Sequence, residues 1–417
     1  MKFTTAITAL AFTLGLAQTA NAFTSLPRGS SAFTNANRQT ASISTRMSTT
    51  TGKSDTTSAA TDEDVAAPLR KDFQTAMDMT VSALKSSVPD PELLGGLEYF
   101  AKEYFTACND AALSGDESST AEGAASNMKE ALQYGMTYGL QDKYKFGSTH
   151  VALRGDPETE DGNTIDFYKF GCDFFRPAMD IENSVVLGQA SLEKIHEQIA
   201  SGENVVMFAN HQSEADPQVM SVLLEKSGSA EEAEKLVYVA GHKVTTDTLA
   251  IPFSMGRNLI CIHSKKHIDA DPDTKPLKSK QNLMAMGGML KLLKNGGTSI
   301  WVAPSGGRDR RDLETGKVPI APFDQKTIDM FRLMGNKSKV PTHFYAVSMV
   351  SYDLCPPPDF VEAGTGEQRN VRFVPVGINV SEELENVGGV ETRHLFTEHA
   401  FEVCQKGYDE LLEKMQQ

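Results

Sequence analysis

Apolar residues recur at helical spacing through the first third of the chain, from about residue 69 to residue 144. Three groups show this spacing: Phe73, Met77, Val81 and Leu84; then Leu97, Phe100 and Tyr104; then Met128, Leu132, Met136 and Leu140. Residues three and four positions apart share one face of a helix. A polar, glycine-containing segment at 114–124 interrupts the pattern and is typical of a loop. The spacing predicts a small helical domain over residues 61–148.

The pattern changes after about residue 150, where short apolar runs alternate with amphipathic segments. The runs lie at 205–209, 236–240, 259–263, 299–303, 344–349 and 371–378, and helical segments lie at 191–202, at 279–297 and from about residue 391. Strands that alternate with helices predict an α/β layer with a mixed, mostly parallel sheet flanked by helices. We therefore predict that residues 149–417 form a larger α/β domain. In such sheets ligand chemistry collects at the carboxyl ends of the strands.

The amino-terminal segment has the pattern of a targeting leader. Residues 1–22 carry Lys2, an apolar stretch too short to span a bilayer, and an A-x-A site ending at Ala22, which predicts a secretory signal peptide. Residues 23–60 begin with Phe23, and residues 1–52 contain no Asp or Glu. We predict a transit peptide and linker over 23–60. Together the two parts resemble the bipartite leader of algae with secondary plastids, in particular the diatom type, which implies import through the endoplasmic reticulum. A secreted protein with a disordered start is the alternative.

Composition narrows the class of protein. The 417 residues are 40% hydrophobic and 23% charged, as in ordinary globular proteins. The formal net charge of −15 argues against a general nucleic-acid binder, which is usually basic. Five cysteines without a CxxC pair predict thiols rather than a disulfide framework, and no His or Cys spacing predicts a metal site. No later apolar run reaches the length of a transmembrane helix, so we expect a soluble or peripheral protein without a transmembrane span.

The segment "ANHQSEADPQVM" (209–220) follows an apolar run and brings a histidine close to an acid. His211 and Asp216 lie five positions apart, and Pro217 suits the first turn of a helix. In one interpretation Asp216 only caps that helix and His211 is a loop residue. In the other, the loop folds His211 back onto Asp216, so that one ring nitrogen is held by the carboxylate and the other accepts a proton.

Two later strands are followed by basic loops. "HSKKHIDADPD" (263–273) carries Lys265, Lys266 and His267, and "WVAPSGGRDRRD" (301–312) carries Arg308, Arg310 and Arg311. Arginine presents a planar donor fork that matches phosphate oxygens. In the second loop Gly306 and Gly307 permit a sharp turn and a close approach to a ligand. Ser305 lacks the G-x-S-x-G pattern of a hydrolase nucleophile.

Charge is unevenly distributed along the chain. Residues 257–311 contain eleven Lys and Arg against four Asp, a net charge of +7 in a chain of −15. A positive segment inside an acidic protein predicts a site for an anion, or for an acidic partner attracted by its field.

These motifs, in this order, resemble one family. "NHQSEADP", "GHKVTTDTLAIPFSMGRNLICIHSKKHI", "WVAPSGGRDRRD", "APFD" and "YDLCPPP" are similar to segments of the plastid glycerol-3-phosphate acyltransferases, and the resemblance covers most of residues 150–385. It implies that a fatty acyl group passes from acyl-acyl-carrier-protein, or acyl-CoA, to the sn-1 hydroxyl of glycerol 3-phosphate, with no cofactor, in the plastid stroma. The product would be lysophosphatidic acid, in the first step of plastid glycerolipid synthesis.

The resemblance also implies roles for individual residues. His211 matches the general base and Asp216 the carboxylate that orients it. The phosphate-binding cluster matches Lys266, His267, Arg308 and Arg310, with Arg257, Lys265, Ser305, Gly306 and Gly307 in support. The basic segment 257–311 would receive the acidic acyl carrier protein. His242, Lys243 and Arg311 depart from the plant pattern, so acyl preference is not carried over.

Two alternatives remain open from the residues. A lysophosphatidic acid acyltransferase shares the H-x-x-x-x-D motif, but it usually has membrane-embedding apolar segments that this chain lacks. A non-catalytic module that binds a carrier protein or an anionic lipid would use the basic segment alone and would have no need of His211 beside Asp216.

Overall fold

The computed structural model describes residues 62–155, 165–264, 268–269, 271–358, 368–385 and 391–416. The signal peptide and the transit segment predicted over residues 1–60 lie outside the described residues. So do Lys265, Lys266 and His267.

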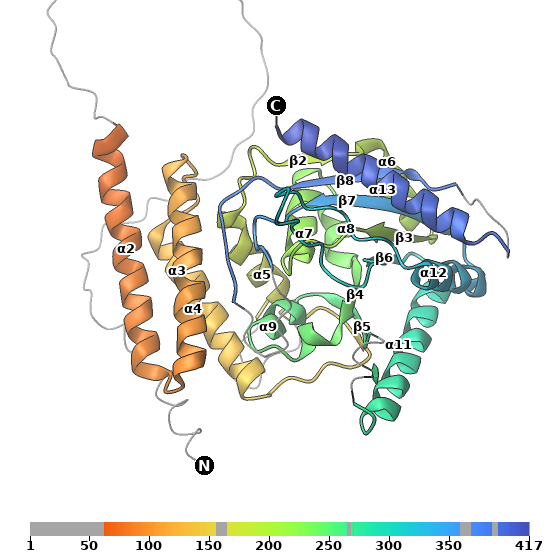
Figure 1. Cartoon of the computed structure of the whole chain (residues 1–417), viewed down its shortest axis with the longest axis horizontal. Helices are drawn as coiled ribbons and strands as arrows, with labels where there is room; N and C mark the ends of the chain where they lie inside the picture. Colours follow the sequence, from red (N-terminus) through yellow and green to blue (C-terminus); the bar gives the residue numbers. More distant parts are fainter. Residues whose placement is uncertain are drawn as a thin grey trace, which may run out of the picture.

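Helices form the first part of the described chain, as predicted. They are α2 (Asp62–Ser87), α3 (Pro91–Leu113) and α4 (Ala121–Tyr134), followed by the π-helical turn η2 (Gly135–Leu140). Figure 1 shows α2, α3 and α4 side by side at one flank of the molecule. The sequence sets the start of α3, because the Asp90 side chain accepts hydrogen bonds from the N–H groups of Glu92 and Leu93 and Pro91 fits the first turn.

An eight-stranded sheet forms the centre of the remaining chain, in the order β1-β5-β4-β6-β3-β7-β8-β2. The strands are β1 (Thr149–His150), β2 (Val185–Leu187), β3 (Asn204–Ala209), β4 (Val237–Gly241), β5 (Asn258–Ile262), β6 (Ser299–Val302), β7 (Thr342–Val350) and β8 (Gly377–Glu383). β1 runs antiparallel to β5 and β7 antiparallel to β8, and the other neighbours are parallel. The predicted mixed, mostly parallel sheet is confirmed.

Helices cover both faces of this sheet (Figure 1). They are α5 (Phe167–Phe175), α6 (Gln189–Ala200), α7 (Asp216–Lys226), α8 (Ala230–Lys235), α9 (Ala250–Met255), α11 (Lys275–Asn295), α12 (Gln325–Ser338) and α13 (His394–Met415), with short 3-10 turns η3 (Arg176–Ala178) and η4 (His242–Thr245). Alternate residues of β3 belong to different cores: Val205 and Met207 pack on one side of the sheet, and Val206 and Phe208 on the other. Burial on both faces explains why this strand is one uninterrupted apolar run.

The helical segment shares its core with one face of the sheet. A single apolar cluster extends from Phe73 in α2 to Val380 in β8. At its centre the Tyr104 and Phe174 rings stack 4.2 Å apart, and the Tyr104 hydroxyl donates to the Phe174 carbonyl. A continuous buried core, and not only the connecting chain, therefore joins these helices to the sheet.

One predicted strand is wrong over most of its length. The apolar run 371–378 predicts a strand, but β8 begins only at Gly377. Pro375 lacks the N–H that a ladder needs, and before it Val374 makes only an isolated bridge to Met179. Among the described residues, no helix is both long and apolar enough to span a membrane.

Candidate active site

Asn210 and Gln212 fix the backbone on either side of His211. The Asn210 side chain exchanges two hydrogen bonds with the backbone of Met349 at the end of β7, at 2.7 and 3.0 Å. The Gln212 side-chain oxygen accepts from the N–H groups of Ser351 and Tyr352, at 2.8 and 3.1 Å. Both amides are fully buried. They continue the contact between β3 and β7 through side chains and leave the residue between them pointing outward.

His211 lies against Asp216, as the second interpretation of the motif requires. The imidazole Nδ1 is 2.7 Å from Asp216 Oδ2, the histidine side chain is 27% exposed, and the aspartate is fully buried. A carboxylate at Nδ1 selects the tautomer with a proton there, which leaves Nε2 as an acceptor. No hydrogen bond to Nε2 is recorded among the described residues. The Trp301 ring lies edge-on, 6.0 Å away, and limits tilting of the imidazole.

The Asp216 carboxylate faces the loop rather than the helix. It accepts hydrogen bonds from the N–H groups of Gln212 and Ser213, and from the hydroxyls of Ser213 and Ser351. α7 begins at Asp216, and no side chain caps it, so the capping interpretation is wrong. Burial works to raise the pKa of Asp216, but these bonds and His211 outweigh it and lower that pKa. The carboxylate is thus ionised and pre-oriented.

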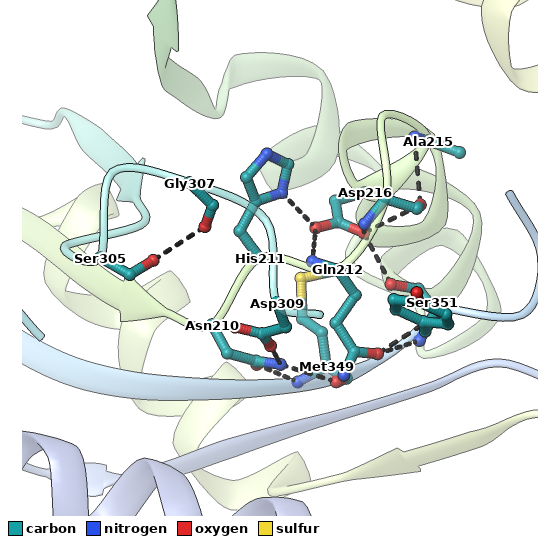
Figure 2. A network of polar contacts seen from close by, with 12 residues as sticks. Asn210, His211, Gln212, Ala215, Asp216, Ser305, Gly307, Asp309, Met349 and Ser351 are labelled. Carbon is teal, nitrogen blue, oxygen red and sulfur yellow. Dashed lines mark hydrogen bonds and ion pairs between the residues drawn. The ribbon is translucent and has the colours of Figure 1, made fainter. Parts of the chain in front are cut away.

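A tight turn after β6 places the arginine-bearing loop beside His211. Gly306 adopts a φ of +70°, and the Ser305 hydroxyl donates to the Gly307 carbonyl at 3.0 Å. Figure 2 shows the imidazole between this turn and Asp216. The loop then returns, and the Asp309 N–H donates to the His211 carbonyl at 2.6 Å. The two loops are therefore joined directly through their backbones.

Asp309 is a buried acid under the site that the sequence motifs did not single out. Its carboxylate accepts from the Asn210 side chain at 3.1 Å and from the Ala321 N–H at 2.9 Å. Burial raises the pKa of Asp309 to about 6, although these two bonds work to lower it. A signal was present in the sequence, since an acid between two arginines in an otherwise basic loop needs a structural reason.

The arginines that flank Asp309 are half-buried. Arg310 donates from Nη1 to the Pro358 carbonyl at 2.8 Å, which holds its side chain at the edge of the segment that follows β7. Arg311 donates to Gly316 and pairs with Asp353. Arg308 and Arg310 adjoin the His211 loop through Asp309. Lys265, Lys266 and His267, the other expected phosphate contacts, lie outside the described residues.

Arg257 does not join this cluster. It precedes β5, at the amino end of the strand, and it is only 3% exposed. Its guanidinium donates to the Ser221 hydroxyl and to Cys172, and it lies over the Tyr168 ring. The expectation that Arg257 supports phosphate binding is therefore wrong, because its charge is enclosed in the core between α5 and α7.

The motif loop has a second anchor that sequence reasoning missed. Arg369 pairs with Glu214 at 2.6 Å and with Asp247 at 2.8 Å. Asp247 in turn accepts from the N–H groups at the start of α9. Glu214 stands inside the motif, but its partner Arg369 lies 155 positions away, and only the fold brings the two together.

The candidate site lies along the edge of the sheet at which the neighbouring strands β3, β6, β4 and β5 have their carboxyl ends. His211 follows β3, Ser305 follows β6, and His242 and His263 follow β4 and β5 with their rings 4.2 Å apart. Parallel strands place these residues along one edge, as expected. No group of three or more His, Cys, Asp or Glu side chains arranged to hold a metal ion occurs in the described ranges.

Comparison with known proteins shows which proteins the chain is similar to. Residues 192–350 match the family model described as Acyltransferase. The chain is 38% identical over 304 residues to the chloroplastic glycerol-3-phosphate acyltransferase of Arabidopsis thaliana, covering 73% of this chain and 64% of that protein. The protein of the same name from Spinacia oleracea is 37% identical over 304 residues, covering 73% and 62%. The chain thus spans less than two thirds of the length of these relatives.

Among solved structures, the 1-acyl-sn-glycerophosphate acyltransferase PlsC from Thermotoga maritima is 20% identical with a TM-score of 0.35, covering 59% of this chain and 78% of that one. That similarity is too low to bear on substrate or activity. Residues 192–350 are thus similar to an acyltransferase domain, and about three quarters of the chain is similar to plant proteins named chloroplastic glycerol-3-phosphate acyltransferase.

Proposed function

We propose that the protein is a glycerol-3-phosphate acyltransferase of the plastid stroma. It would move a fatty acyl group from acyl-acyl-carrier-protein to the sn-1 hydroxyl of glycerol 3-phosphate and form lysophosphatidic acid. The observation that carries this proposal is the 2.7 Å contact of His211 with a buried, ionised Asp216, beside a loop that bears Arg308 and Arg310. The names of the plant relatives support the acceptor and the plastid.

In the proposed reaction His211 is the general base. Its Nε2 removes the proton of the acceptor hydroxyl, whose oxygen attacks the thioester carbonyl carbon. The tetrahedral intermediate collapses, the carbon–sulfur bond breaks, and the imidazolium returns its proton to the leaving thiolate. Asp216 keeps the Nδ1 proton in place and stabilises the imidazolium. A positioned acid–base group of this kind contributes about 10²–10⁴ in rate.

Arg308 and Arg310 would hold the phosphate, together with Lys266 and His267, so that the hydroxyl meets Nε2. Ser305, Gly306 and Gly307 shape the turn that presents the arginines, and Lys265 adds positive charge. Fixing one end of the substrate turns an encounter of two molecules into an oriented attack. The part of the basic segment 257–311 that borders His211 would attract the acidic carrier protein, so the on-rate should fall with ionic strength.

The test is acyl transfer by the purified chain with glycerol 3-phosphate and a panel of acyl-carrier-protein and CoA thioesters. We expect lysophosphatidic acid from the wild type and a loss of about 10²–10⁴ in kcat for His211→Ala. His394→Ala, a change at an exposed position at the start of α13, is the matched control. Substantial turnover by His211→Ala would exclude the base. Faster acylation of lysophosphatidic acid than of glycerol 3-phosphate would favour the second enzyme class, and carrier binding without product a binding module.

A further inference from the structure

The outer flank of α11 combines exposed apolar side chains with lysines. Leu277, Leu283 and Met284 are 58%, 73% and 56% exposed. The helix contains five lysines and no Asp or Glu, in a chain with a net charge of −15. Four of the lysines, at 275, 280, 291 and 294, are exposed, and Lys275 pairs with Asp269. Scattered single apolar residues are normal on a surface, but three on one helix between basic residues form a patch.

Helical geometry separates this flank from the one that packs on the sheet. Ala285, Met289 and Leu293 recur every four residues and are buried. Leu277, Lys280, Met284 and Lys291 recur at intervals of three, four and seven on the opposite side, with Leu283 and Lys294 beside them. Gly288 lies against Thr149, where a Cβ would come within 2.4 Å of that side chain, and so seats the helix on β1. The exposed flank is thus fixed relative to the body of the protein.

We infer that this flank of α11 docks the protein on an anionic lipid surface. The lysines meet the lipid phosphates while their stems and the three apolar side chains enter the headgroup boundary, as in interfacial helices. Figure 1 shows α11 on the outside of the molecule, next to β5. The inference does not depend on the proposed function, since it uses only exposure, charge and shape.

Chemistry favours lipid over a protein partner. Protein interfaces are enriched in aromatic residues, Met and Arg and depleted in lysine, and their anchors enter concave pockets. This flank is a single convex helix that offers Leu, Met and Lys. An acyl carrier protein would share the negative charge of an anionic membrane, but it would not take up three apolar side chains into a fluid layer.

Vesicle cosedimentation with the full chain tests the inference. Vesicles of phosphatidylcholine with phosphatidylglycerol are compared with phosphatidylcholine alone, at low and high salt. We expect binding to the anionic vesicles that weakens with salt, and a decrease of about tenfold in affinity for L283E/M284E. M79E is the matched control, because Met79 is 65% exposed on α2, far from α11 in the fold. Any contribution of residues 1–61 is common to all variants.

Hydrogen exchange locates the contact. Vesicles should protect amides of residues 275–295, and K280Q/K291Q/K294Q should lose the dependence on anionic lipid while retaining the wild-type melting temperature. L283E/M284E that binds vesicles as well as M79E would overturn the inference. So would protection of 275–295 by acyl carrier protein but not by vesicles.

Discussion

At the residue scale, the Asp216 carboxylate is the group on which the orientation of His211 depends. Four donors besides His211 hold it, so replacing it leaves several of them without an acceptor. Asp216→Asn keeps the shape but removes the charge and one acceptor. We expect kcat to fall by about 10²–10⁴ with little change in KM, because the residue acts on the base rather than on the substrate.

Ser351→Ala removes one of these four donors and leaves the Asp216 carboxylate in place, so it tests a smaller disturbance of the same group. The loss should be smaller than for Asp216→Asn, at about 1 kcal/mol of stability and a modest decrease in kcat. Asp78→Asn, an exposed change on α2, is the control. Near-normal kcat for Asp216→Asn would mean that the hydrogen bond to His211 has no part in the reaction.

Asp309 predicts a pH dependence of stability. Its pKa is about 6 in the folded protein, above the ordinary 3.8 of an unfolded aspartate. A raised folded pKa contributes stability that is present below pH 3.8 and is lost as pH rises through about 6. Asp309→Asn should therefore gain stability relative to wild type between these limits, by up to about 3 kcal/mol.

Urea unfolding at several pH values between 4 and 7.5 measures this difference. Asp216, whose lowered pKa acts in the opposite direction, is present in both proteins, and its charge is one of the causes that raise the pKa of Asp309. Asp324→Asn, on the exposed cap of α12, controls for the change of residue type. A stability difference that is constant with pH would show that Asp309 titrates as an ordinary aspartate.

At the element scale, Arg369 joins the motif loop to α9. Arg369→Met retains much of the volume but leaves Glu214 and Asp247 as partly buried acids without their cation. Removing one partner of a buried pair is strongly destabilising, so we expect a loss of about 3 kcal/mol in denaturant unfolding. Arg372→Met, at a more exposed site nearby, should cost far less. Equal effects of the two changes would argue against a structural role for the cluster.

Long apolar runs made the central elements predictable. β3, β6 and β7 are covered on both faces, so their sequences are almost continuously hydrophobic. The edge strands β1 and β2 were missed because two or three residues carry no periodic pattern. Pro375 was visible in the run 371–378, but its effect on pairing was not weighed.

The site was predictable where the motif is local. The contact between His211 and Asp216 spans five residues, whereas the bonds of Asn210 to Met349 and of Glu214 to Arg369 span 139 and 155. Sequence spacing indicates which residues can meet within one loop, and it carries no information on which strand end lies opposite. Arg257 shows the converse. It lies shortly before the basic loop that begins at His263, but its guanidinium is buried against Ser221 and Cys172, away from the candidate site.

At the scale of the whole molecule, one apolar cluster includes the helices α2–α4 and a face of the sheet. We therefore predict a single cooperative thermal transition for the described part of the chain, with the calorimetric and van't Hoff enthalpies in agreement. Phe174→Ala should shift that whole transition to lower temperature, because Phe174 stacks on Tyr104 across the junction.

Leu333→Ala, on an exposed position of α12, is the matched control and should leave the transition almost unchanged. Two separate transitions, or a Phe174→Ala effect confined to one of them, would show that the helical segment unfolds independently.

The hydrogen bond from the Asp309 N–H to the His211 carbonyl affects how far the two loops can fluctuate relative to each other. A catalytic group and a substrate clamp on separate loops would fluctuate independently, and the variance of their separation would be the sum of the two. Here the backbone of one loop is tethered directly to that of the other. Thermal displacements of the strand edge then move the two loop backbones together, and in the proposed mechanism this would limit changes in the distance between His211 and the arginines that hold the phosphate.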